Sequence, residues 1–177
     1  MRLAFISTIL GHPWGGADTL WTRAAEAASA RGDQLLISVS TAVANHPRIA
    51  ALIAAGAGVV IRDPATSPPS FGARVLRKLG LARSADAGLI AALRSFRPDL
   101  VIFSHGGTYD LVLHPVLTAW LRSNGTPYRI IANWQEEHPQ LDEASLAFIR
   151  EAFAAADRLN FVSTRNLTVT RRHLGLP

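Results

Sequence analysis

The chain contains no cysteine. Disulfides, thiolate metal sites and cysteine nucleophiles are therefore excluded. Long apolar runs are also missing. The run from Leu3 to Leu10 has about the length of a strand and meets a Gly-His-Pro sequence without a signal-cleavage pattern. No stretch approaches the ~20 residues that a membrane-spanning helix needs. These absences suit a reducing compartment, and we expect a cytoplasmic protein.

Several nucleotide and hydrolase motifs are absent as well. Neither Gly-x-Gly-x-x-Gly nor a Walker A loop occurs, and the run 35–39 is followed by no acid that could hold a ribose. Flavin, nicotinamide and P-loop chemistry are therefore not expected. No serine lies in Gly-x-Ser-x-Gly, and no nucleic-acid-binding module is recognised. Glu137 and His138 lack a third ligand, so we expect no metal site.

Lysine is nearly absent too, since Lys78 is the only one among 18 basic residues. The net charge of +5 is carried by arginine. This balance permits an anionic ligand but does not choose between a nucleotide phosphate and an anionic membrane surface.

What the sequence does contain is an alternation of short apolar runs with longer helical patterns over 177 residues, of which 49% are hydrophobic. This length fits one domain, and the pattern predicts a Rossmann-like, doubly wound parallel sheet with helices on both faces. Strands are expected at 3–6, 35–39, 58–61, 100–103, 128–132 and 159–162. Helices are expected at about 18–32, 47–56, 73–81, 85–96, 111–123 and 142–156, and from 164 onward.

The usual strand order of this fold places the first strand beside the fourth, and ligands bind beyond the carboxyl ends of the strands at that point. The loop 11–18 should therefore lie beside the loop 104–108. The loop 133–139 should lie next along the same edge.

The first candidate site is formed by Gly15, Gly16 and Asp18, where a loop meets a helix. Two glycines let the backbone approach a ligand closely, and a helix start offers unpaired amides that suit a phosphate. The alternative is a plain turn in which the glycines only supply unusual dihedral angles.

The second candidate is His105-Gly106-Gly107, after the predicted fourth strand. His105 is the one candidate for a catalytic residue, as a proton acceptor or as a hydrogen-bonding partner of the ligand. The alternative is a histidine that merely fixes the loop.

The third candidate gathers amide, aromatic and carboxylate groups in Asn133, Trp134, Gln135 and Glu136. This mixture suits carbohydrate, with a flat apolar face for the ring and polar groups for the hydroxyls. The alternative is a solvated loop with a buried tryptophan anchor.

A basic stretch follows the third predicted strand and contains Arg74, Arg77 and Lys78. A basic amphipathic helix can rest on an anionic membrane, which would make the protein peripheral at the inner face of that membrane. An ordinary surface helix explains the same pattern.

At three places the sequence resembles the amino-terminal domain of GT-B glycosyltransferases of the metal-independent, retaining, family-4-like class. These places are the first strand and Gly-Gly loop, the fourth strand, and the sixth strand with the helix after it. The matching segments are residues 1–7 with 14–21, residues 97–105, and residues 155–163 with Asn166 and 171–177.

The resemblance implies an acceptor-side domain at 1–163 and, at 164–177, a helix leading to an interdomain linker. It also implies an absent carboxyl-terminal domain that binds the donor. The whole enzyme would move a sugar from a nucleotide-sugar to a glycan, lipid or small-molecule acceptor without a cofactor, and this domain alone would be inactive. Many relatives have a histidine after the fifth strand, where Asn133-Trp134-Gln135 stands here. A non-catalytic module for a phosphorylated or sugar-like ligand is the alternative, and a scaffold without a ligand is a further one.

Overall fold

The computed structural model describes residues 1–9, 13–62, 86–139 and 141–175. Six parallel strands form one sheet in the order β3-β2-β1-β4-β5-β6. The predicted doubly wound α/β fold is therefore confirmed, with the first strand beside the fourth. The strands are β1 (Arg2–Ser7), β2 (Gln34–Ser40), β3 (Gly58–Arg62), β4 (Leu100–His105), β5 (Tyr128–Ala132) and β6 (Arg158–Phe161).

Three of the described α-helices, α2, α6 and α7, begin after a residue whose side chain caps them. The ring of His46 accepts from the amide of Arg48 in front of α2, and the carboxylate of Asp142 accepts from the amide of Ser145 at 2.7 Å in front of α6. Such caps satisfy amides that have no partner inside the helix. The α-helices are α1 (Gly16–Ala30), α2 (Pro47–Ala54), α4 (Ala87–Phe96), α5 (Pro115–Ser123), α6 (Glu143–Ala154) and α7 (Thr164–Leu174).

The single helix predicted at 111–123 is wrong. The structure has a short 3₁₀ helix, η1 (Asp110–Leu113), followed by α5. Pro115 has no amide hydrogen, and it disfavours helical dihedral angles at the residue before it. His114 accordingly takes φ −125° and ψ 46°, so the chain turns there and α5 starts afresh.

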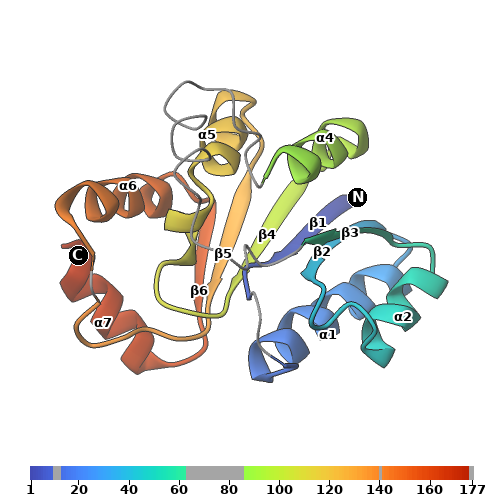
Figure 1. Cartoon of the computed structure of the whole chain (residues 1–177), viewed down its shortest axis with the longest axis horizontal. Helices are drawn as coiled ribbons and strands as arrows, with labels where there is room; N and C mark the ends of the chain where they lie inside the picture. The colour runs from blue at the N-terminus through green and yellow to red at the C-terminus, as the bar shows by residue number, and fades with distance from the viewer. Residues whose placement is uncertain (10–12, 63–85, 140, 176–177) are drawn as a thin grey trace, which may run out of the picture.

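Two layers of helices cover the sheet (Figure 1). Helices α1 and α2 pack on one face over Phe5, Ile37 and Ile102, whereas α4, α5 and α6 pack on the other over Phe103 and Ile130. Successive residues of a strand point to opposite faces, which is why Ile102 and Phe103 belong to different cores.

The membrane hypothesis gains nothing from the structure. Arg74, Arg77 and Lys78, with the whole helix expected at 73–81, lie outside the described residues. Within the described ranges, every helix is too short or too polar to cross a membrane.

Candidate functional site

The loops after β1 and β4 open onto one hollow of about 560 Å³. It lies beyond the carboxyl ends of these strands, where the order of the sheet reverses, which is where ligands bind in folds of this kind. The loop after β5 contributes to the same wall. The lining residues are Thr8, Ile9, Pro13, Gly15, Gly16, Ala17, Asp18, Gly106, Gly107, Asp110, Leu113, Asn133 and Trp134.

The start of α1 is capped from within by Asp18. This carboxylate is fully buried and accepts from the amide of Gly15 at 3.1 Å and from the indole of Trp21 at 3.3 Å. Gly15 and Gly16 are exposed, and an added Cβ at either would meet no atom of the described residues within 4 Å. Packing therefore does not require these two glycines, and their open side adjoins the hollow.

The loop after β4 is built around the carboxylate of Asp110. One oxygen of this group accepts from the hydroxyl of Thr8 at 2.6 Å and from the amides of Gly106 and Gly107, each at 2.9 Å. The loops after β1 and β4 are therefore joined through one side chain. Because Asp110 occupies both glycine amides, these amides are not open to a ligand anion.

Gly106 is a position at which packing does demand glycine. A Cβ there would lie 2.2 Å from Cγ1 of Ile9. We expect Gly106→Ala to lower the free energy of unfolding by about 1–2 kcal/mol, because such an overlap forces the backbone or Ile9 to shift. Urea unfolding measures this. Gly16→Ala, which meets no atom, should leave stability within about 0.5 kcal/mol, and equal losses in both variants would contradict the reasoning.

Asn133 and Trp134 form the wall contributed by the loop after β5. The Asn133 amide group donates to the carbonyl of His105 at 2.6 Å and to the hydroxyl of Ser104 at 3.1 Å, which ties this loop to the end of β4. Trp134 is 54% exposed. It is thus a large aromatic surface left open to solvent beside the hollow.

Three predicted site residues, Gln135, Glu136 and His105, do not line the hollow. Glu136 is exposed, and its amide donates to the hydroxyl of Thr108 at 2.7 Å. The side chain of Gln135 is fully buried, and neither of its polar atoms has a hydrogen-bond partner among the described residues. The prediction that these side chains face a ligand at the hollow has no support in this geometry.

His105 departs most from the expectation. Its ring is fully buried, lies 6.0 Å from the ring of Phe153, and has no hydrogen-bond partner at either nitrogen within the described part of the chain. Burial lowers the pKa of His105 to about 4, although the carboxylate of Asp110 acts in the opposite direction. The imidazole is therefore neutral at pH 7. It is held in the core and not at the wall of the hollow.

The sequence reasoning missed Thr8 and Asp110 among the lining residues. Both carried a signal, since Thr8 directly follows the apolar run of the first strand and Asp110 follows a Gly-Gly pair at the spacing of a loop-closing aspartate. Ile9, Pro13, Ala17 and Leu113 also line the hollow and carried no such signal. Within the described ranges, no three His, Asp or Glu side chains gather to hold a metal ion.

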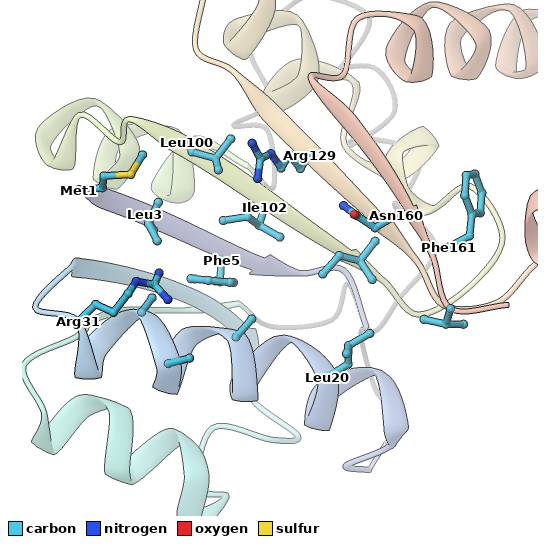
Figure 2. Close-up of a pocket in the computed structure, with 15 residues that line it drawn as sticks. Met1, Leu3, Phe5, Leu20, Arg31, Leu100, Ile102, Arg129, Asn160 and Phe161 are labelled. Atoms are coloured by element: carbon cyan, nitrogen blue, oxygen red, sulfur yellow. The ribbon is translucent and has the colours of Figure 1, made fainter.

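A second, larger hollow of about 860 Å³ runs between α1 and the exposed face of β4, β5 and β6 (Figure 2). Apolar side chains such as Leu20, Phe5 and Ile102 line most of it. Its charged residues, Arg31 and Arg129, already pair with Asp33 and Asp157, and Asn160 is the one uncharged residue with a polar side chain that lines it in the described part of the chain. Since convergent polar groups are what orient a ligand, the smaller hollow at the β1/β4 reversal is the better candidate site.

No protein-family model and no curated protein sequence matches the chain. Among solved structures, the chain is similar to the crystal structure of MurG from Acinetobacter baumannii, with a TM-score of 0.51 and 12% identity. The match covers 90% of this chain and 40% of the MurG chain. At this identity the likeness concerns the fold alone: a parallel, Rossmann-like sheet with helices on both faces, as in one half of a GT-B architecture. The chain thus spans less than half the length of MurG.

Proposed function

We propose that this chain is the acceptor-side domain of a GT-B glycosyltransferase, which moves a sugar from a nucleotide-sugar donor to a glycan, lipid or small-molecule acceptor. The fold likeness to MurG supports the architecture, because it concerns a Rossmann-like sheet of the kind that forms one half of a GT-B fold. The resemblance of the sequence supports the narrower assignment to retaining, family-4-like enzymes. A second domain would bind the donor, and this domain alone would not turn over.

The single observation that carries the proposal is the composition of the hollow at the β1/β4 reversal. It combines an exposed indole at Trp134, the carboxylates of Asp18 and Asp110, and the open edge of Gly15-Gly16. An aromatic face packs against the apolar side of a sugar ring. The Asp110 oxygen that is not bonded to Thr8, Gly106 and Gly107 can accept from a hydroxyl, whereas the buried carboxylate of Asp18 fixes the start of α1. A neutral, hydroxyl-rich acceptor suits the interior of the hollow better than a phosphate does, because Asp110 already occupies the amides of Gly106 and Gly107.

The donor diphosphate would approach at the start of α1. The first amides of a helix have no acceptor inside the helix, and the helix dipole favours negative charge there. In the proposed mechanism these dipoles stabilise the departing nucleotide diphosphate. The hollow meanwhile holds the acceptor hydroxyl near the sugar. The role of His105 is then to shape the end of β4 from the core, and no proton transfer is assigned to it.

Binding tests this proposal without requiring turnover. The chain is titrated with a panel of nucleotide-sugars and methyl glycosides, and tryptophan fluorescence is followed with Trp134→Phe as the reference. We expect at least one methyl glycoside to change the fluorescence of the native chain but not that of the Trp134→Phe variant. A panel in which nothing binds would overturn the proposal. Binding without any transfer, once the complete natural polypeptide is assayed with its donor, would indicate a binding module instead.

Gly16 offers the sharpest variant for the same assay. A leucine at this position projects into open space beside the hollow, and it raises helix propensity by about 0.8 kcal/mol relative to glycine. We expect Gly16→Leu to weaken ligand binding at least about tenfold, through occlusion, at an unchanged or higher melting temperature. The matched control is Gly88→Leu, because Gly88 is exposed in the first turn of α4 and an added Cβ there also meets no described atom within 4 Å. Equal affinities in the two variants would contradict the placement of the site.

A further inference from the structure

Helix α7 holds the loop after β5 through several contacts. The side chain of Asn166 donates to the carbonyl of Asn133 at 3.0 Å, and Arg165 donates to the carbonyl of Gln135 at 2.9 Å. Glu137 is ion-paired with Arg165 at 3.3 Å and with Arg172. The hydrogen bond from Arg172 holds the pKa of Glu137 below its ordinary value. Carbonyls on both sides of Trp134 are therefore anchored to the same helix.

Arg165 differs from the other members of this set because it also contacts the indole. Its guanidinium carbon lies over the ring of Trp134, 5.8 Å from the ring centre. A planar guanidinium stacks on an aromatic face while its remaining N–H groups donate elsewhere, which an ammonium group cannot reproduce. One side chain thus contacts the ring, the carbonyl that follows it, and the carboxylate of the loop.

Among the described residues, Arg165 alone makes a polar or ring contact with the side chain of Trp134. The ring is 54% exposed and lines the hollow. An exposed tryptophan would sample several rotamers, and ordering it on binding has an entropic cost. A contact that restricts the ring beforehand reduces this cost.

We propose that Arg165 is a positioning residue that fixes the ring of Trp134 at the wall of the hollow, where the ring stacks against a sugar. This inference takes its ligand, a sugar, from the proposed function, whereas the contact between Arg165 and Trp134 does not depend on that function. It gives α7 a role in the site. Any element that moves α7 moves the sugar-facing ring with it.

The order of the ring is measured without a ligand. The ¹⁵N–¹H signal of the Trp134 indole is one of four tryptophan indole signals, and its loss in Trp134→Phe assigns it. We expect Arg165→Gln to lower the heteronuclear NOE of this indole markedly and Arg172→Gln to leave it unchanged. Arg172 is the matched control because it binds the same carboxylate, Glu137, and has no recorded contact with the ring.

Affinity for methyl glycosides is the second measurement, on the same variants. We expect Arg165→Gln to weaken their binding about fivefold at a melting temperature close to that of the native chain, with Arg172→Gln unaffected. An unchanged indole NOE in Arg165→Gln would overturn the inference, as would an equal loss in Arg172→Gln, which would assign the effect to the ion pair. If the native chain binds no methyl glycoside, the proposed function fails, and the NOE still decides whether Arg165 positions the ring.

Discussion

Asp110→Ala should lower the free energy of unfolding by about 3 kcal/mol, because three donors lose their shared acceptor at once. These donors are the hydroxyl of Thr8, at 2.6 Å, and the amides of Gly106 and Gly107, at 2.9 Å each. A part-buried donor without a partner keeps most of its desolvation penalty. Thr8 keeps its bonds to the carbonyl of Ser104, at 3.0 Å from its amide and 3.1 Å from its hydroxyl, so the loss falls mainly on the amides of Gly106 and Gly107 and on the wall that they form.

Urea denaturation with a matched acid tests this expectation. Asp157→Ala removes an exposed carboxylate whose partner is Arg129, and exposed ion pairs contribute about 0–1 kcal/mol. Asp110→Asn keeps one acceptor oxygen and should fall between the two alanine variants. If Asp110→Ala were as stable as Asp157→Ala, the carboxylate would not join the two loops.

Lowering the pH from 6.5 to 4 should reduce the free energy of unfolding by about 3 kcal/mol through the protonation of His105. The cause is burial, which lowers the pKa of this imidazole from 6.5 to about 4. Between these two pKa values the imidazole is protonated in the unfolded chain and stays neutral in the folded chain, so acid favours unfolding. This contribution to stability is fully present above the pKa that His105 has in the unfolded state, and it is lost as the pH falls toward the pKa of the folded state.

Other groups also titrate in this range, so the measurement is a difference between variants. The free energy of unfolding is determined at pH 7, 5.5 and 4 for the native chain and for His105→Leu, which removes the buried imidazole. The native chain should lose about 3 kcal/mol relative to this variant. Parallel pH profiles for the native chain and His105→Leu would show that the imidazole titrates normally.

The sequence predicted the sheet because each strand is a short apolar run between helical patterns. Once the order of the strands was expected, the meeting of the loops around Gly16 and Gly107 followed from topology. Those two loops indeed line one hollow. Trp134 also lies there, since the carboxyl ends of parallel strands share one edge of the sheet.

The sequence did not predict where the side chain of His105 points. The fourth strand was expected to end at Phe103, but β4 continues to His105. Residues 101, 103 and 105 of one strand share a face, so His105 follows Val101 and Phe103 into the core beneath α6. A boundary error of two residues therefore exchanged a ligand-facing loop residue for a core residue.

Contacts between segments that lie far apart in the chain could not be predicted from the sequence either. Arg165 lies about thirty residues after the loop that it holds, at Gln135 and Glu137. Charge patterning along one helix says nothing about such a partner. The same holds for Asp110, which accepts from Thr8, a residue of the loop after β1 about a hundred positions earlier.

Backbone amide mapping tests the central claim most directly. The ¹⁵N-labelled chain is titrated with nucleotide-sugars and methyl glycosides, and the shifted signals are placed on the structure. We expect the largest shifts at Gly15, Gly16 and Gly107 and at the indole of Trp134, all around the hollow where β1 meets β4. Shifts confined to the groove of Leu20, Ala24 and Ala27 (Figure 2), or no shifts at all, would contradict the account.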